Sequence, residues 1–299
     1  MDILSSPTFT ENKQLILLAT ATLLTAILIS LLTSKPLPRT SQSCPITSSS
    51  PVPSKFKRLT EKGSPEIILA TLAQKSAYPH SSPFVAKLDA VLRTANLKFT
   101  VKTIEYTQLP TEKIPVVHWN GEILSDSHLI IKRLVKEGVM QDLDAWLTDE
   151  QKARANMFRY GIENFIYFRM VQERWIHNWE LTKKEYFEGT MPWLVYKIVP
   201  DRFIQPNVVD MLYKNGTTRY PEESWLEMLV EFWRDAAELL GDKKYFFGNE
   251  SKCVVDLSAF GVLTNVIEFR DLNPTLYDVV VKHENLVRFT ERVKKELYQ

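Results

Sequence analysis

A fifteen-residue stretch over 113–127, KIPVVHWNGEILSDS, limits the possible folds more than any other part of the chain. A short apolar run after Pro115 begins a strand, and Asn120-Gly121 favours a two-residue hairpin turn because both positions accept positive φ. The return strand over 122–124 leads to Ser125-Asp126-Ser127, whose side-chain oxygens are suited to capping a helix. The stretch therefore predicts a strand, a tight turn, a second strand and a capped helix.

Pro115 stands at the entrance of the first of these strands. Proline has no N–H and is tolerated at a strand start, where the X-Pro bond is either trans or cis. A cis bond would turn the backbone N–H and C=O of Ile114 outward, free to pair with a peptide-like ligand as an added strand does. The helix start at 125–127 would present unpaired N–H groups to a carboxylate. Together these groups predict half of a binding site for a small, acidic, peptide-like molecule.

The residues before this stretch complete a small mixed sheet with helices. The run EIILATL over 66–72 is typical of a buried strand, and KFTVKTI over 98–104 alternates with the period of a second strand. Between them, SSPFVAKLDAVLRTANL over 81–97 has its apolar residues on one helical face. Ser81 or Ser82 is expected to cap this helix, with Pro83 at its first position. Periodicity thus predicts a thioredoxin-like α/β domain over residues 64–140.

Residues 145–299 form an all-helical second domain in our interpretation. Thr148 and Gln151 have the spacing of a capping box, and Gly241 is placed to end a long helix. Prolines between 191 and 206 predict short helices and bends. The first helical run carries an aromatic stripe, which indicates core packing and is also compatible with the wall of an apolar pocket. Its members are Phe158, Tyr160, Phe165, Tyr167, Phe168, Trp175 and Trp179.

The N-terminal region predicts a membrane anchor. After a tail over 1–13, residues 14–34 carry no charge and suffice to cross a hydrocarbon core of roughly 30 Å as a helix. A cleaved signal peptide is the alternative, but its apolar region would be shorter. Residues 35–63, rich in Pro, Ser and Thr with few large apolar groups, are interpreted as a flexible linker. One basic residue precedes the apolar run and several follow it, so we expect the bulk of the protein to face the cytosol. The outer mitochondrial membrane and the endoplasmic reticulum both fit such an anchor.

Composition excludes several classes of function. The net charge of +1 provides no basic surface for nucleic acid. Two cysteines cannot build a disulfide framework, which favours a reducing compartment. The five histidines are scattered and there is no Cys-x-x-Cys, so no metal site is expected.

Several motifs, taken in order, resemble a known family. Ser-Pro-Phe-x-x-Lys-Leu from Ser82, then Lys-Ile-Pro, then Gly-Glu-Ile-x-x-Asp-Ser resemble the N-terminal domain of glutathione S-transferases. More narrowly, they resemble the failed-axon-connections and metaxin-like branch of that superfamily. Cys253-Val-Val-Asp256 and the segment from His283 are similar to the second domain, so the resemblance covers residues 64–299. It implies a thioredoxin-like N-terminal domain plus an all-α C-terminal domain, here preceded by one transmembrane helix.

The resemblance also implies a glutathione site. Ser82 takes the catalytic position, where its N–H and hydroxyl at a helix start would stabilise the thiolate. Ile114 would pair its backbone with the cysteinyl amide, and Pro115 would hold that geometry. At the γ-glutamyl end, Ser127 would meet the carboxylate and Asp126 the ammonium group. Each residue also has a purely structural explanation, because a cap and a strand-entry proline serve the fold with or without a ligand.

Two positions depart from the family pattern. The branch tends to carry a cysteine where this chain has Val85, and disulfide exchange through the motif is therefore excluded, since a thiolate is the nucleophile. Cys253 stands where Ser or Thr usually opens the capping box of the central helix, which predicts a weaker cap. Asp256, the matching acid, is interpreted as a folding residue.

Two functions remain open at this point. The first is a membrane-anchored glutathione S-transferase-like protein that binds glutathione and conjugates it to a small apolar electrophile. The alternative is a non-catalytic adaptor or membrane-assembly component of the metaxin and failed-axon-connections type. The bilayer is the expected partner of residues 14–34. Protein partners or a homodimer fit either reading.

Overall fold

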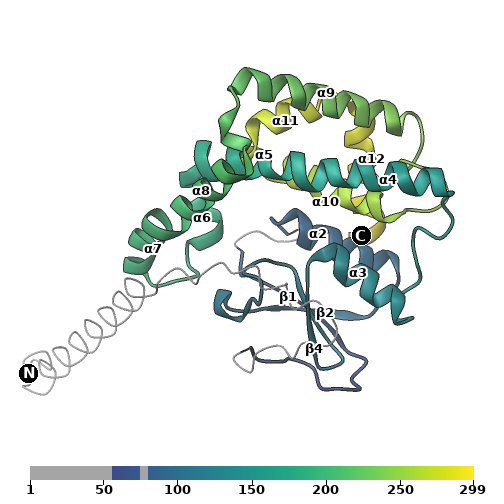
Figure 1. Cartoon of the computed structure of the whole chain (residues 1–299), viewed down its shortest axis with the longest axis horizontal. Coiled ribbons are helices and arrows are strands. Elements are labelled where there is room, and N and C mark those ends of the chain that lie inside the picture. Colours follow the sequence, from purple (N-terminus) through teal and green to yellow (C-terminus); the bar gives the residue numbers. More distant parts are fainter. Residues whose placement is uncertain (1–55, 75–79) are drawn as a thin grey trace, which may run out of the picture. The chain divides into compact units, whose positions relative to one another are not determined.

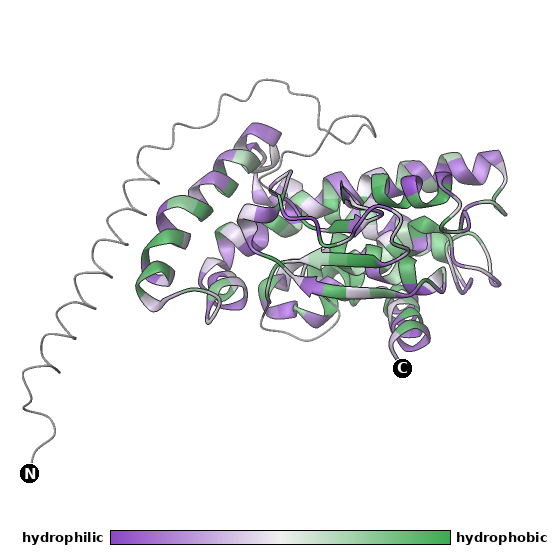
Figure 2. Cartoon of the chain, turned by 90° about the horizontal axis from the view of Figure 1, so that it is seen from below, coloured by the Kyte–Doolittle hydropathy of each residue, from purple (hydrophilic) through white to green (hydrophobic). Residues whose placement is uncertain are grey.

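The computed structural model describes residues 56–74 and 80–299, all within one compact unit. The predicted tail, the anchor over 14–34 and most of the linker lie outside these residues. In the described part of the chain, no helix combines the length and the apolar character needed to cross a bilayer. Figure 2 shows hydrophobic and hydrophilic residues mixed along its helices.

A four-stranded mixed sheet forms the first domain, as predicted. Its strands are β1 (Ile67–Thr71), β2 (Phe99–Thr103), β3 (Val116–Trp119) and β4 (Glu122–Ser125), in the order β2-β1-β3-β4. β1 runs parallel to β2 and antiparallel to β3, and β4 pairs antiparallel with β3. This is the thioredoxin-like arrangement, and its two central strands are buried along their whole length.

The hairpin between β3 and β4 has the predicted turn. Asn120 and Gly121 both have positive φ, at 51° and 72°, as a two-residue turn of this kind requires. Trp119 pairs with Glu122 across the turn, which fixes the register. The strands alternate between two apolar clusters, so that Val117 faces the main core and Val116 the smaller cluster on the other face of the sheet.

Two helices connect and complete the sheet. α2 (Pro83–Thr94) joins β1 to β2 with Pro83 at its first position, and α3 (Ser127–Lys136) follows β4. A short 3₁₀ turn, η2 (Tyr106–Gln108), lies in the link before β3. In Figure 1, α2 and α3 lie between the sheet and the helices α4 and α10 of the second domain.

The second domain is helical throughout, with π-helical turns (η3, η4, η5) and 3₁₀ turns (η6, η7) among its α-helices. The predicted capping box at Thr148 is confirmed, with Gln151 N–H 3.2 Å from Thr148 Oγ1 and Thr148 N–H 2.9 Å from Gln151 Oε1. Gly241 follows the last residue of α9, as predicted. In chain order the elements are α4 (Asp149–Tyr160), η3 (Gly161–Ile166), α5 (Tyr167–Gln172), η4 (Glu173–His177), α6 (Trp179–Phe187), α7 (Trp193–Val199), η5 (Pro200–Ile204), α8 (Gln205–Asn215), η6 (Thr217–Arg219), α9 (Glu222–Leu240), α10 (Val254–Glu268), η7 (Arg270–Leu272), α11 (Pro274–Val280) and α12 (Glu284–Tyr298).

The central helix α10 joins the two domains by packing against α2. A Cβ atom at Gly261 would lie 2.5 Å from the carbonyl oxygen of Pro83, so only glycine permits this approach. At the helix start, the buried Asp256 carboxylate accepts hydrogen bonds from the N–H groups of Phe246 and Cys253, at 2.7 and 2.8 Å. The Cys253 thiol also donates to it, at 2.9 Å. These contacts agree with a structural role for Asp256.

The predicted flexible linker is too long at its C-terminal end. Residues 56–63, the part of it that the structure describes, are bound to the edge of the sheet domain. Gly63 N–H donates to Asn120 Oδ1 at 2.6 Å, and Gly121 N–H donates to Thr60 Oγ1 at 3.1 Å. The Pro- and Ser-rich composition that suggested a linker is concentrated before residue 55, and the later residues have partners in the hairpin.

Candidate functional site

Ser82 is the N-terminal cap residue of α2, but its hydroxyl does not cap the helix. Its backbone is extended, with φ −91° and ψ 121°, and its carbonyl accepts the Ala86 N–H at 3.0 Å. The hydroxyl makes no hydrogen bond with any described residue, and the side chain is half-buried. The capping explanation for a serine at this position therefore does not apply, and the hydroxyl is left for another partner.

One part of the predicted site is wrong: the backbone N–H of Ser82 is not available to a ligand. Sequence reasoning assigned this N–H to a bound sulfur, but it donates to His80 Nδ1 at 2.9 Å. His80 Nε2 lies 2.8 Å from Thr71 Oγ1. Burial lowers the pKa of His80 to about 4, so the ring is neutral at physiological pH. Because Nδ1 accepts, the single ring proton lies on Nε2, beside Thr71 Oγ1, and the ring also has the backbone of Leu72 as a hydrogen-bond partner. Sequence reasoning missed His80, which it treated as one of five scattered histidines.

The residues just before Ser82 are fixed by both domains. Gln74 Oε1, in the sheet domain, accepts from the N–H and hydroxyl of Ser81 at 2.8 and 3.0 Å. The Ser81 carbonyl accepts from Arg174 Nη1 at 2.7 Å and from the Tyr186 hydroxyl at 3.2 Å. Asn265 on α10 donates to the carbonyl of His80 at 2.9 Å. The entry to α2 is therefore held partly by side chains that lie about a hundred residues or more away in the sequence.

The Ile114–Pro115 peptide bond is cis, one of the two predicted states. Pairing between β1 and β3 begins at Val116, so the N–H and C=O of Ile114 are not taken by the sheet. Both backbone groups therefore have no partner in the sheet, as the predicted pairing with a peptide-like ligand would require.

Asp126 caps α3 as the sequence predicts. Its Oδ1 accepts the N–H groups of His128 and Leu129 at 2.9 and 3.0 Å, while Oδ2 accepts no hydrogen bond from a described residue. The side chain is exposed, and its φ of 72° is uncommon for a residue other than glycine. Ser127 is buried and is the first residue of the helix, where its N–H has no intrahelical partner. One carboxylate oxygen and one amide thus remain for a ligand at this end.

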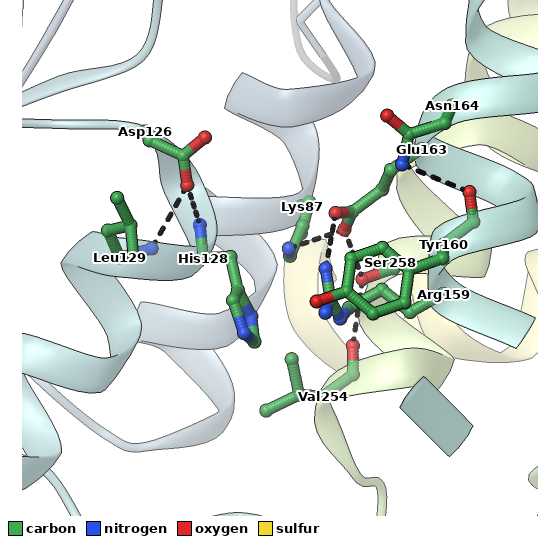
Figure 3. A network of polar contacts seen from close by, with 10 residues as sticks. All are labelled: Lys87, Asp126, His128, Leu129, Arg159, Tyr160, Glu163, Asn164, Val254 and Ser258. Atoms are coloured by element: carbon green, nitrogen blue, oxygen red, sulfur yellow. Dashed lines mark hydrogen bonds and ion pairs between the residues drawn. The ribbon is translucent and has the colours of Figure 1, made fainter. Parts of the chain in front are cut away.

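A buried ionic cluster, which sequence reasoning missed, lies next to Asp126 and connects the domains (Figure 3). Lys87 on α2 is 1% exposed, and its Nζ lies 2.6 Å from Glu163 Oε1. Arg159 Nη1 contacts Glu163 Oε2 at 2.8 Å, and the Ser258 hydroxyl donates to Oε1 at 3.1 Å. Burial alone would raise the pKa of Glu163, but the Lys87 and Arg159 cations hold it below its usual value. Glu163 is therefore ionised at neutral pH.

The cluster extends to α3 through His128, the residue after Ser127. Burial and the nearby Arg159 and Lys87 cations lower the pKa of His128 to about 4. Its Nδ1 is buried without a hydrogen-bond partner among the described residues. Burial lowers the pKa of Lys87, while Glu163 and, more weakly, Asp126 favour its charged form. The motif Ser-Pro-Phe-x-x-Lys-Leu contains Lys87, but its partner Glu163 follows 76 residues later, beyond any local pattern.

The predicted aromatic stripe divides into two groups. Phe158 and Phe165 pack in the core, with ring centroids 5.8 and 5.9 Å from that of Phe232 on α9. Tyr160 is exposed, whereas two later members lie near the start of α2. Tyr167 contacts Phe84 at 4.7 Å between centroids, and Trp175 stacks on Tyr186 at 6.0 Å. These four side chains are half-buried, and they place aromatic surface beside Ser82.

Val85 lies in the core. It is 0% exposed and belongs to the main apolar cluster, whereas Ser82 is partly exposed. A cysteine at position 85 would therefore point into the core in this structure. The presence of valine instead of cysteine at position 85 therefore affects core packing rather than the candidate site.

The fold and the site together define a class: a thioredoxin-like domain with a Ser-Pro helix start and a strand-entry cis-proline, joined to a helical domain. The family described as glutathione S-transferase N-terminal domain matches residues 83–181, and the one described as glutathione S-transferase, C-terminal domain matches residues 234–293. The two matches together span just over half of the chain. The chain belongs to the glutathione S-transferase superfamily.

Solved structures agree on the fold. The β-etherase LigF from Sphingobium sp. strain SYK-6 superposes with a TM-score of 0.54 at 12% identity, covering 78% of this chain and 98% of that one. A glutathione S-transferase from Rhodospirillum rubrum F11 gives a TM-score of 0.50 at 14% identity, covering 76% and 87%. Identities this low show a common fold and do not extend to substrates. The segment over 182–233, with most of α6 and the whole of α7 and α8, falls between the two family matches.

Proposed function

We propose that this protein is a membrane-anchored glutathione S-transferase-like enzyme that binds glutathione and conjugates it to a small apolar electrophile. The observation that carries the proposal is the Ser82 hydroxyl, which is partly exposed at the start of α2 and makes no bond to a described residue. A hydroxyl at a helix start can donate to a thiolate, and the positive end of the helix dipole favours the anion. In a chain of this superfamily, these are the properties required at the sulfur position.

The remaining residues suit the rest of the tripeptide. The Ile114 backbone groups are available for the cysteinyl amide, and the Ser127 N–H is available for the γ-glutamyl carboxylate. Asp126 Oδ2, which is not used by the cap, suits the ammonium group. The thiol proton passes to solvent, and the thiolate attacks an electrophilic carbon. A C–S bond forms while the bond from that carbon to a leaving group such as a halide breaks, and the leaving group departs to solvent with the bonding electron pair. The aromatic side chains beside Ser82 would hold the apolar part of the electrophile.

A second function, a non-catalytic adaptor or membrane-assembly component of the metaxin and failed-axon-connections type, has its own support. The Ser82 N–H donates to His80, so that of the two donors predicted for the sulfur position only the Ser82 hydroxyl remains. In this reading the cap at Asp126 and the proline serve the fold alone. Protein partners or a second copy of the chain would then use the surface of the helical domain. Val85, the departure from the branch pattern, does not favour this alternative, because its side chain lies in the core.

The membrane anchor over residues 14–34 forms part of the proposal. Its support is the uncharged apolar sequence, and the basic residues after it favour a cytosolic position for residues 56–299. Either the outer mitochondrial membrane or the endoplasmic reticulum is a suitable host. Protease added to intact organelles should remove the folded domains, and a protected body would contradict this orientation.

Calorimetric titration of the full-length protein in detergent micelles with glutathione separates the two functions. The enzyme proposal expects saturable heat and a rise in the melting temperature at millimolar glutathione. Ophthalmic acid, a glutathione analogue with a methyl group in place of the thiol, should bind with similar affinity, because the sulfur contact contributes to reactivity more than to binding. Absence of both heat and thermal shift at millimolar glutathione would refute the enzyme proposal and leave the adaptor.

A further inference from the structure

Arg174, in η4 of the helical domain, is a buried cation with no acidic partner among the residues that the structure describes. Only 3% of it is exposed. Its donors reach five acceptors: Asn273 Oδ1 at 2.7 Å, the Ser81 carbonyl at 2.7 Å, the Tyr186 hydroxyl at 3.0 Å, and Asn265 Oδ1 and O at 3.2 and 3.4 Å. None of these described contacts is a carboxylate. A buried charge is costly unless it is paired, so an arginine held by neutral groups alone requires an explanation.

Glu173, the residue before Arg174, is acidic, but the two side chains form no ion pair in the described structure. The Glu173 carboxylate is buried as well, but it accepts the N–H groups of Thr275 and Leu276 at the start of α11. Arg174 is therefore held by neutral acceptors, and one of the two nearest is the carbonyl of Ser81, the residue before Ser82.

Arg174 begins a chain of hydrogen bonds that passes through the Ser81–Ser82 peptide group. Its guanidinium donates to the Ser81 carbonyl at 2.7 Å, and the N–H of the same peptide group donates to His80 Nδ1 at 2.9 Å. His80 Nε2 in turn lies 2.8 Å from Thr71 Oγ1, on β1. All donors point the same way along this chain, so each bond polarises and strengthens the next. The chain fixes the plane of the peptide that positions Ser82.

Tyr186 reinforces the contact from a part of the chain outside both family matches. Its hydroxyl accepts from Arg174 at 3.0 Å and lies 3.2 Å from the Ser81 carbonyl. The α6 segment thus acts on the same carbonyl as Arg174.

We propose that Arg174 is the positioning residue of the Ser82 site: it fixes the Ser81–Ser82 peptide from the helical domain and supplies the unpaired positive charge that favours an anion beside the Ser82 hydroxyl. The proposal deepens the proposed function and rests on it for the identity of the anion, the glutathione thiolate. The geometric part, fixation of the Ser82 amide, does not depend on a ligand.

The matched control is Arg169, another buried arginine in the same helical run. It is 1% exposed and is bound in a bidentate ion pair to Glu222, without contact to Ser81. Arg174→Gln removes the charge while keeping a donor, and Tyr186→Phe removes one hydroxyl from a half-buried residue. Arg169→Lys reports the cost of altering a buried arginine elsewhere.

The test uses full-length protein in detergent micelles and has two readouts. The first is the pH titration of the ultraviolet absorbance of the thiolate of bound glutathione. We expect Arg174→Gln to raise the pKa of that thiol by about one unit, a roughly tenfold loss of thiolate at neutral pH. Tyr186→Phe should give a smaller rise, and Arg169→Lys none. The second readout is hydrogen exchange at the Ser82 amide without ligand, which should become about tenfold faster in Arg174→Gln but not in Arg169→Lys.

The outcomes are distinguishable. If wild-type protein binds no glutathione, the proposed function fails, and faster exchange at Ser82 still supports the positioning role. If glutathione binds and neither Arg174→Gln nor Tyr186→Phe changes its thiol pKa or the exchange of Ser82, the inference is wrong while the proposed function stands. Should Arg174→Gln not fold, Tyr186→Phe decides by the same two readouts.

Discussion

The two ends of the candidate site are connected to the helical domain in different ways. At Ser82 the connection uses hydrogen bonds, from Arg174 and Tyr186 to the Ser81 carbonyl. At Asp126 and Ser127 it uses ions, through Lys87 and Arg159 around Glu163. Hydrogen bonds to a peptide group fix the direction of a backbone, whereas an ionic cluster sets the local charge. The proposed sulfur end thus depends on the orientation of one peptide group and on the charge of one arginine, whereas the proposed γ-glutamyl end lies beside a cluster of paired charges.

The largest effect is expected where the ionic cluster loses its only described acid. Glu163→Gln removes the carboxylate that contacts both buried basic side chains, Lys87 and Arg159. Loss of one partner of a buried ion pair typically costs about 3–5 kcal/mol, and we expect a decrease of that size in the free energy of unfolding. Urea denaturation measures it.

A matched control for this variant is Glu150→Gln, since Glu150 pairs with Arg154 on the exposed face of α4. We expect that substitution to cost under about 0.5 kcal/mol. Equal effects of the two substitutions would show that the interdomain cluster is no more important than a surface pair.

Acid should weaken the Ser82 end through His80. Its pKa is lowered from 6.5 to about 4 in the folded state, so the unfolded chain binds a proton first as the pH falls. Stability from the neutral ring is complete above pH 6.5 and decreases between pH 6.5 and about 4, by about 3 kcal/mol in total. The urea midpoint measured across this range should fall, and less so in His80→Gln. An identical pH dependence in that variant would contradict the assignment.

The smallest effect on stability is expected for Asp126→Asn, which tests whether Asp126 binds a ligand in addition to capping α3. Asparagine also caps helices and tolerates positive φ, so Asp126→Asn should change the free energy of unfolding by under about 0.5 kcal/mol. The lost charge should nevertheless weaken glutathione binding about tenfold, which corresponds to 1.4 kcal/mol. Calorimetry and urea denaturation of the same variant give both numbers. Unchanged affinity would mean that Asp126 serves the helix only.

The comparison also shows which features a sequence reveals. The hairpin at Asn120-Gly121, the cap at Asp126 and the box at Thr148 depend on neighbours within a few residues, and all three were predictable. The succession of strands and helices along the first domain followed from periodicity, and the resemblance implied the same thioredoxin-like domain.

Features that depend on distant residues were missed. Glu163 meets Lys87 across 76 positions, and Arg174 meets Ser81 across 93. Nothing in the sequence around Arg174 indicates that it contacts the Ser81–Ser82 peptide group. The same reason explains why the Ser82 N–H was wrongly assigned to the ligand. This N–H donates to His80 Nδ1, and the position of the His80 ring depends on the fold although His80 is only two residues away.

The central claim is that the Ser82 hydroxyl acts on the sulfur of bound glutathione. Its most direct test is the fraction of bound glutathione present as thiolate at neutral pH, measured by ultraviolet difference absorbance in full-length wild type and Ser82→Ala. Because no described residue uses the hydroxyl, the variant should keep its stability and its affinity for glutathione. We predict at least about a tenfold loss of thiolate, equivalent to a rise of one pKa unit. An equal thiolate fraction in the two proteins would contradict the account.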